Sequence, residues 1–198
     1  MSTSIAAVLL PVGGYLSGSI LPAHILARRR GVDFRALGKN PGTAETFRTF
    51  GFRPALLVYL LDVAKALLPL VAAKLLRVPG WSLLLTAAAA VAGHNWSVYY
   101  RFWGGKGLAT ASGVLLFLVP LYFSIALLPA LLAWRRTGWV PASGVVGFPI
   151  IIVLTWLAET DLIFRTAAIL LPLVILVRVR RDIIANWPFR PAGRDASR

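Results

Sequence analysis

A single lysine surrounded by glycines is the feature of this sequence that most directly suggests chemistry. Lys106 lies among Gly104, Gly105 and Gly107, with apolar segments on both sides. Glycine lets a backbone approach a ligand closely and adopt positive φ angles, and a lysine ammonium supplies a point charge for an anion. The stretch therefore predicts an anion-binding loop. The alternative is an ordinary basic turn between two membrane helices.

A second candidate anion site lies in residues 28–54. The middle of this segment reads Gly38-Lys39-Asn40-Pro41-Gly42, and Gly, Asn and Pro mark tight turns. Successive backbone N–H groups in such turns form concavities that bind anions. The segment also holds seven basic residues: Arg28, Arg29, Arg30, Arg35, Lys39, Arg48 and Arg53. Turn and charge together predict a phosphate cradle beside Lys39 and Arg48.

The remaining candidates are polar residues inside or at the ends of apolar segments. Ser19 either helps helices to pack closely or presents a hydroxyl to a polar cavity. Asp62 and Lys65 lie three positions apart on one helix face, so they form either a structural ion pair or a functional one. His94 lies near the end of its apolar segment, as a hydrogen-bonded helix-end residue or as part of the same cavity.

Composition indicates the class of protein in which these groups are positioned. Of the 198 residues, 58% are hydrophobic and 14% charged, whereas soluble domains are about 45–50% apolar and about 25% charged. The net charge of +14 fits a nucleic-acid binder or a membrane protein with basic cytoplasmic loops. Only the second explains the apolar content. The chain lacks cysteine and has two histidines, so we expect no metal site; we also predict no cofactor.

Hydropathy predicts an all-α integral membrane protein with about seven transmembrane helices in one membrane domain, residues 1–198. The apolar region 108–134 is too long for one ordinary span, and Pro120 divides it into two short ones. We expect the last residues, 188–198, to form a flexible basic tail. The other predicted spans cover about 5–27, 55–75, 81–98, 140–157 and 162–177.

Charge predicts the orientation of these spans. With the N-terminus outside and the C-terminus cytoplasmic, the cytoplasmic segments hold 17 of the 21 Lys and Arg residues. The segment 28–54 and the loop at Lys106 then share the cytoplasmic face. No charge precedes the first apolar run, so a retained span is expected in place of a signal peptide.

Several segments, taken in order, give the chain a family resemblance. It resembles the bacterial acyl-phosphate:glycerol-3-phosphate acyltransferase family, often called PlsY. Roughly residues 13–120 carry the resemblance. The segments are Tyr15-Leu16-Ser17-Gly18-Ser19-Ile20, Gly38-Lys39-Asn40-Pro41-Gly42, Phe47-Arg48, Leu61-Asp62-Val63-Ala64-Lys65, Gly93-His94 and Gly104-Gly105-Lys106-Gly107-Leu108-Ala109-Thr110.

The resemblance implies a seven-span enzyme of the bacterial inner membrane with a cytoplasm-facing site. Such an enzyme moves an acyl chain from acyl phosphate to glycerol 3-phosphate, without a metal or a covalent acyl-enzyme, to give lysophosphatidic acid. It implies that Lys106 and Arg48 handle substrate phosphate, that the Gly38–Gly42 turn holds acyl phosphate, and that Ser19 is a small polar site residue. Residue chemistry and the resemblance together predict that the substrate-binding residues are Ser19, Gly38, Lys39, Asn40, Gly42, His94, Gly104, Gly105 and Gly107.

The sequence departs from the family pattern at several polar positions. Gly38 stands where the family typically has serine, Ala44 where it has threonine and Glu45 where it has asparagine. The late His-Arg-Glu-Asn motif is absent from residues 178–182. We therefore predict Lys106, Arg48 and Glu45 as the catalytic set, with Glu45 acting as a base or as a partner of Arg48 or Lys39.

Two further functions remain open from the sequence. One is a catalytically altered relative that binds phospholipid or phosphate-bearing metabolites, or that acylates another acceptor. The other is a small transporter, which the lack of an inverted repeat disfavours. Membrane lipid is an expected partner and nucleic acid is not, while the sequence leaves the oligomeric state undetermined.

Overall fold

The computed structural model describes residues 3–185, and every regular element in that range is helical. Four segments are long and apolar enough to cross a membrane: Thr3–Arg29, Phe52–Leu75, Pro141–Ala158 and Leu162–Arg180. This confirms the predicted helical membrane class. The predicted tail, 188–198, lies outside the described residues.

The elements are α1 (Thr3–Gly18), α2 (Pro22–Arg29), α3 (Thr43–Phe50), α4 (Phe52–Leu75), α5 (Gly80–Asn95), the short 3₁₀ helix η1 (Val98–Tyr100), α6 (Leu108–Leu118), α7 (Pro120–Thr137), α8 (Pro141–Ala158) and α9 (Leu162–Ala185).

The first predicted span, 5–27, is two helices, α1 and α2, instead of one. The backbone leaves helical geometry between Ser19 and Leu21 and resumes it at Pro22. Proline has no N–H to continue the ladder, and it pushes the preceding residue out of the α region. Leu21 accordingly has φ −112° and ψ 87°. The third predicted span, 81–98, likewise ends early, at Asn95.

Hydropathy predicts residues 28–54 as one basic cytoplasmic loop, and this prediction is wrong for the second half of the segment. It contains α3, and α4 begins within it at Phe52. Gly51, at φ 84°, separates the two helices, in a conformation that glycine adopts at little cost. Phe34 is fully buried in a small core with Ala27 and Val58, against which Phe50 also packs. This core fixes the segment to α2 and α4.

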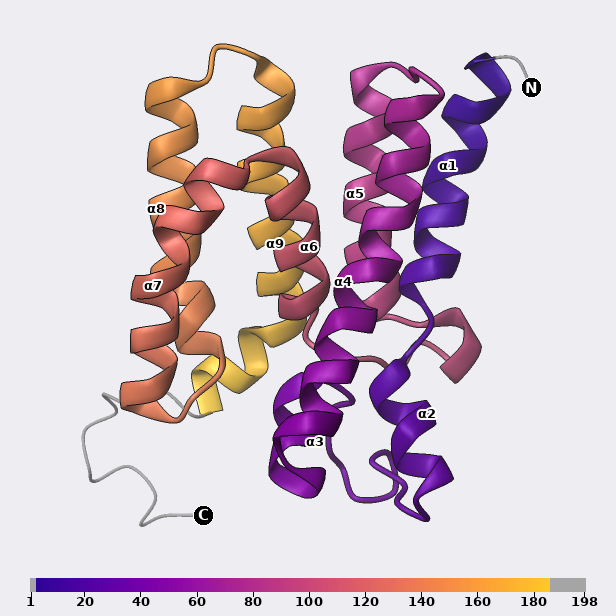
Figure 1. The fold of residues 1–198 in the computed structure, drawn as a ribbon, viewed down its shortest axis with the longest axis vertical. Helices are drawn as coiled ribbons and strands as arrows, with labels where there is room; N and C mark the ends of the chain where they lie inside the picture. Colours follow the sequence, from indigo (N-terminus) through magenta and orange to yellow (C-terminus); the bar gives the residue numbers. More distant parts are fainter. Residues whose placement is uncertain (1–2, 186–198) are drawn as a thin grey trace.

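The helices form a bundle in which α1 packs on α4 and α5, and α8 packs on α7 and α9 (Figure 1). Contacts of α4 with α6 and of α5 with α9 join the two groups. Glycines allow close approach of α1 and α5. A Cβ on Gly18 would overlap the Ala90 backbone, and one on Gly93 would overlap the Tyr15 carbonyl oxygen. Small residues serve helix packing in this way in membranes.

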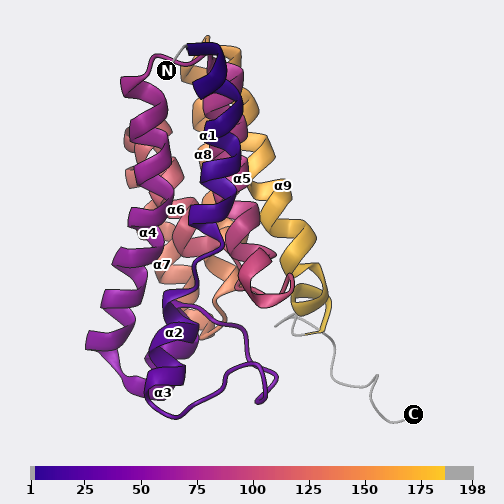
Figure 2. The same ribbon diagram turned by 90° about the vertical axis from the view of Figure 1, so that its right-hand side faces the viewer.

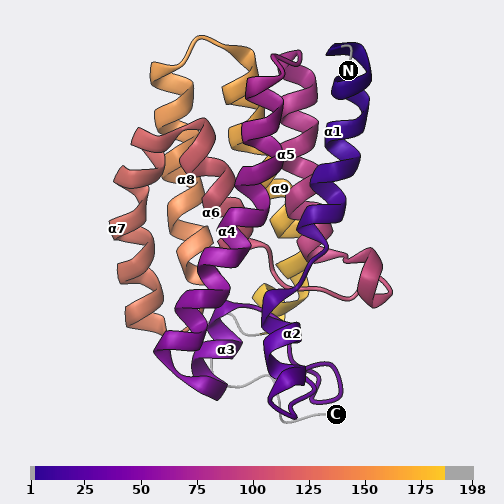
Figure 3. The same cartoon turned by 45° about the vertical axis from the view of Figure 1, so that its right-hand side comes forward.

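The break predicted near Pro120 is present. Helix α6 ends at Leu118, and Pro120 begins α7. The two helices meet well short of the bundle end that holds the N-terminus (Figures 1 and 3). The first residue of α6 and the last residue of α7 therefore lie toward the opposite end of the bundle. Helices α2 and α3 and the 30–42 segment also lie there (Figure 2). We call this the basic end, because it gathers Arg28–Arg30, Arg48, Lys106 and Arg135–Arg136.

Candidate active site

A polar cavity of about 400 Å³ opens at the basic end of the bundle. It is lined by the 38–42 turn and the first half of α3, by the 106–109 segment and by residues 139–141. Side chains of α4 and α5 reach it from the membrane interior. The charged and titratable residues in its wall are Lys39, Glu45, Arg48, Asp62, His94 and Lys106. The cavity thus joins the two anion-binding stretches predicted from the sequence.

The N-terminus of α3 forms part of this wall. Gly42 is its extended N-cap residue and supplies no side-chain cap. The first helical N–H groups have no partner within a helix, and the helix dipole makes such an end attractive to anions. Thr43 adds a buried hydroxyl that has no hydrogen-bond partner among the side chains and backbone groups that the structure describes. This wall is therefore suited to a phosphate group.

Glu45 lies between two cations of the cavity. Its Oε1 is 2.7 Å from Lys39 Nζ, and its Oε2 is 3.6 Å from Arg48 Nη1. The carboxylate is largely enclosed, whereas about half of each cationic side chain is exposed. Both oxygens are therefore engaged in ion pairs, which is the geometry of a partner that orients Lys39 and Arg48.

The glycines around Lys106 act by close packing. A Cβ on Gly105 would overlap His94 Nε2 and the Pro41 carbonyl oxygen, so only glycine fits between α5 and the 38–42 turn. Gly107, at φ 77°, is the N-cap residue of α6. This packing places the half-buried Lys106 in the cavity wall.

Arg178 of α9 holds the two anion-binding stretches together. Its guanidinium donates to Asn40 Oδ1 at 3.0 Å, to the Gly104 carbonyl at 2.9 Å and to the Gly105 carbonyl at 3.1 Å. The planar guanidinium presents several donors in fixed directions, so one side chain fixes two loops. Sequence reasoning missed this residue. The only signal was its place in the region of the late family motif.

A buried ionic cluster closes the membrane side of the cavity. Lys65 Nζ lies 2.8 Å from Asp62 Oδ1, 2.8 Å from His94 Nδ1 and 2.6 Å from the Ile20 carbonyl oxygen. The buried ammonium is thus ion-paired with Asp62 and hydrogen-bonded to His94 and the Ile20 carbonyl. Asp62 and His94 face the cavity, while Lys65 reaches the break between α1 and α2. The pair predicted on one face of α4 is therefore part of a network with α5.

Most of the predicted site residues meet at this cavity. Gly104 and Gly105 are buried behind Lys106 and are outside the cavity lining. Ser19 lies elsewhere: it is fully buried, donates to the Tyr15 carbonyl and accepts from Ser97 through its own carbonyl. The predicted residues in the lining are Gly38, Lys39, Asn40, Gly42, Glu45, Arg48, His94, Lys106 and Gly107.

An apolar groove of about 490 Å³ adjoins the polar cavity. Thr43, Ala44, Leu108, Ala109 and Val140 line both hollows. Helices α4, α6, α7 and α8 supply most of the remaining wall, which is almost entirely hydrophobic. A ligand with an anionic head and a hydrocarbon chain fits this pair of hollows, because each part finds a matching surface.

Fold and site together define a helical membrane protein in which a cavity lined by cationic residues adjoins an apolar groove. The family model described as glycerol-3-phosphate acyltransferase matches residues 8–187. The chain belongs to that family.

Curated relatives extend this match. A glycerol-3-phosphate acyltransferase of Halalkalibacterium halodurans is 41% identical over 65% of this chain and 65% of its own length. Glycerol-3-phosphate acyltransferase 2 of Dehalococcoides mccartyi is 32% identical over 92% of this chain and 90% of its own. A Thermus thermophilus relative of the same name is 39% identical over 72% of this chain and 74% of its own.

Two solved structures share the fold. The glycerol 3-phosphate form of PlsY, an integral membrane glycerol 3-phosphate acyltransferase, has a TM-score of 0.82 and 31% identity over 90% of both chains. Its lysophosphatidic acid form has a TM-score of 0.78 and 28% identity over the same shares.

Proposed function

We propose that this protein transfers an acyl chain from acyl phosphate to glycerol 3-phosphate and so forms lysophosphatidic acid. The observation that carries the proposal is the union of a cationic cavity with an apolar groove through shared wall residues. The substrate and product forms of the related PlsY structures support the acceptor and the product.

The polar cavity would hold the phosphate groups of both substrates. Arg48 and Lys106, which both line the cavity, bind one phosphate, and the N–H groups at the start of α3 receive the other. The hydrocarbon chain of the donor lies in the apolar groove among α4, α6, α7 and α8. Placement of two reactants in one cavity supplies much of the rate of such a reaction.

The chemistry requires no nucleophile from the protein. The acceptor hydroxyl oxygen attacks the acyl carbonyl carbon, an ester C–O bond forms, and the C–O bond to the phosphate leaving group breaks. A bound phosphate oxygen takes the hydroxyl proton. Cations in the wall stabilise the negative charge that develops on the carbonyl oxygen. Because both oxygens of Glu45 are ion-paired, we assign Glu45 to the orientation of Lys39 and Arg48.

We further propose that the basic end faces the bacterial cytoplasm. Basic residues concentrate there, in agreement with the positive-inside rule. Seven crossings, with α6 and α7 as a short pair, then place the N-terminus outside and the end of α9 inside. Soluble acceptor reaches the cavity from the cytoplasm, and the donor enters from the inner-membrane lipid.

A second candidate is transfer to a different acceptor. The carboxylate of Glu45 neutralises part of the positive charge of Lys39 and Arg48, which weakens the attraction of the cavity for an anionic acceptor but not for a neutral hydroxyl compound. Purified protein in lipid nanodiscs, given acyl phosphate with either glycerol 3-phosphate or glycerol, tests both candidates. We expect lysophosphatidic acid with the first acceptor. Faster acylation of glycerol would reverse the assignment of the acceptor.

A further inference from the structure

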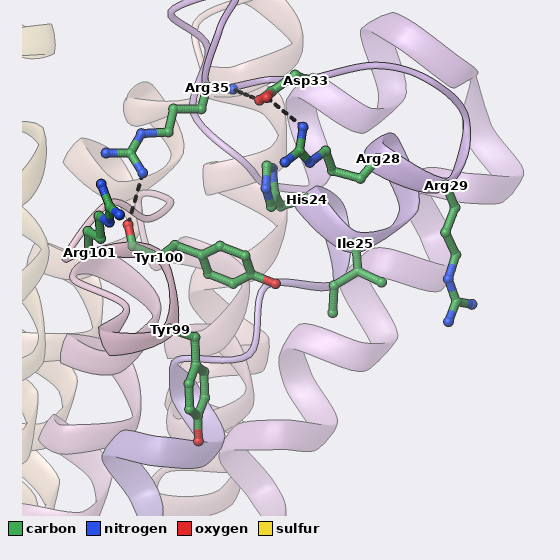
Figure 4. Close-up of a pocket in the computed structure, with 9 residues that line it drawn as sticks. All are labelled: His24, Ile25, Arg28, Arg29, Asp33, Arg35, Tyr99, Tyr100 and Arg101. Carbon is green, nitrogen blue, oxygen red and sulfur yellow. Dashed lines mark hydrogen bonds and ion pairs between the residues drawn. The ribbon is translucent and has the colours of Figure 1, made fainter.

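A second cationic hollow, of about 430 Å³, is lined by residues of α2 and shares no lining residue with the proposed catalytic cavity. We call it the α2 hollow (Figure 4). It lies between α2 and the η1 segment. Arg28, Arg35 and Arg101 line it, Arg29 lies at its edge, and Asp33 is its one acidic residue within the described part of the chain. Its net charge is therefore strongly positive.

Only part of this positive charge is neutralised locally. Asp33 Oδ2 pairs with Arg28 Nη1 at 2.9 Å, and its Oδ1 accepts the backbone N–H groups of Arg35 and Ala36. The Arg35 side chain donates to the Tyr100 carbonyl at 3.3 Å. Among the side chains that the structure describes, no carboxylate pairs with Arg29, Arg35 or Arg101 at ion-pair distance. An anion in the hollow would meet several of these guanidinium groups.

A buried histidine adds an unused polar group to the same wall. His24 is 7% exposed, and its Nδ1 has no hydrogen-bond partner within the described residues. Its ring is held edge-on between Tyr100 and Trp103, at centroid distances of 4.8 and 5.0 Å. Buried polar atoms in native proteins nearly always have a partner. A ligand atom in the hollow would supply one.

The surroundings of the hollow favour a lipid as the source of that anion. The η1 segment projects sideways beside the end of α1 (Figures 1 and 3). Arg101 and Phe102 there both have positive φ, at 54° and 59°. This uncommon backbone places Arg101 in the hollow and leaves Phe102 64% exposed next to the 55% exposed Tyr99. Aromatic residues beside arginines are typical of the headgroup level of a bilayer.

An apolar hollow continues from the cationic one. It measures about 370 Å³, lies between α2 and α4, and shares Ile25 and Arg29 with the α2 hollow. Its wall includes the outward-facing Leu57, Leu61 and Leu68 of α4. Charge and hydrocarbon surface therefore adjoin one another, as they do in the catalytic pair of hollows.

We propose that the α2 hollow is a second lipid site, which binds the phosphate headgroup of an anionic membrane phospholipid while a chain of that lipid lies along the α2–α4 surface. Basic pockets between helices bind anionic headgroups in this manner. The site is separate from the transfer reaction and does not depend on it.

Native mass spectrometry of the full chain in detergent, with added phosphatidylglycerol or phosphatidylcholine, tests this proposal. We expect tighter binding of phosphatidylglycerol. The double variant Arg35→Gln/Arg101→Gln should weaken it by roughly 30-fold, given about 1 kcal/mol for each arginine near an anionic headgroup. The matched control is Arg135→Gln/Arg136→Gln, two exposed arginines at the same end of the bundle, which should keep wild-type affinity. Equal loss in both double variants, or none in the first, would overturn the proposal.

Two further experiments test the part that His24 takes in binding and whether the bound phosphate belongs to a lipid or to a soluble compound. His24→Phe keeps a ring between Tyr100 and Trp103 but removes Nδ1, and we expect a loss of roughly threefold. Wild-type binding in this variant would contradict the part assigned to His24. Inorganic phosphate and glycerol 3-phosphate, added as competitors, should leave the bound lipid in place. Displacement at concentrations similar to that of the lipid would assign the hollow to a soluble phosphate and refute the lipid site.

Discussion

The guanidinium of Arg178 donates to the side chain of Asn40, 138 positions away, at 3.0 Å. The same nitrogen donates to the Gly104 carbonyl, so α9 holds the 38–42 turn against the glycine-lysine stretch. We infer that the relative position of these two cavity walls depends on this contact.

We predict that Arg178→Lys lowers kcat/KM for acyl transfer by roughly 10- to 100-fold, because a lysine cannot span both loops and small misplacements of reactants are costly. Steady-state kinetics in nanodiscs measures the change. Arg180→Lys, an exposed position on the same helix, is the control and should behave as wild type. Wild-type kinetics for Arg178→Lys would show that the two loops hold their positions without it.

The two possible roles of Glu45 predict different decreases in kcat for the Glu45→Gln variant. If Glu45 orients Lys39 and Arg48, Glu45→Gln keeps a hydrogen-bonding side chain and should retain kcat within about tenfold. Removal of a general base costs typically 10²–10⁴-fold. A kcat measurement at saturating donor and acceptor separates the roles, and a loss above about 100-fold would make Glu45 the base.

The buried cluster on α4 should matter for stability. Asp62→Asn leaves the Lys65 ammonium, which is 5% exposed, without its counter-ion. Removal of one partner of a buried ion pair costs about 3–5 kcal/mol. We expect a clear fall in the melting temperature measured by tryptophan fluorescence in detergent.

Two variants control this stability prediction. The double variant Asp62→Leu/Lys65→Met removes both charges and should recover part of the loss. Lys74→Met, on the exposed surface of the same helix, should melt as wild type does. An Asp62→Asn protein with an unchanged melting temperature would mean that the cluster contributes nothing to folding.

The apolar groove should determine which acyl-chain length the enzyme prefers in its acyl phosphate donor. Ala130 of α7 lines it, and a phenylalanine there would fill part of the space for the chain. Ala130→Phe should lower the ratio of kcat/KM for a long-chain acyl phosphate to that for a short one by roughly tenfold. Leu128→Phe, whose site is 65% exposed on α7, is the matched control. An unchanged ratio in Ala130→Phe would place the chain elsewhere.

The sequence predicted best those features that depend on local chemistry. Pro120 separates α6 from α7 because it lacks the N–H that would continue α6 and its fixed φ suits the first position of a new helix. The glycines at 104–107 predicted a close backbone approach, and the structure shows Gly105 packed against His94. The concentration of basic residues in a few loops also predicted that the two anion-binding stretches share one end of the bundle.

Features that depend on contacts between distant segments were missed. Helix α3 is short and polar, so hydropathy did not reveal it within the basic segment. Ser19 looked like a cavity residue, but the break before Pro22 turns its bonds toward Tyr15 and Ser97. The role of Arg178 depends on two loops that the chain brings together only after folding.

The most direct test of the account is the effect of Lys106→Ala on lysophosphatidic acid formation from acyl phosphate and glycerol 3-phosphate in nanodiscs. Lys106 belongs to the glycine-lysine stretch and lines the cationic cavity. Loss of a charge that stabilises the transition state typically lowers kcat by about 10²–10³-fold. Arg136→Ala, an exposed cation at the same end, should keep wild-type activity. We predict a loss of at least about 100-fold for Lys106→Ala alone. Undiminished product formation in that variant would contradict the assignment of this cavity as the site of acyl transfer.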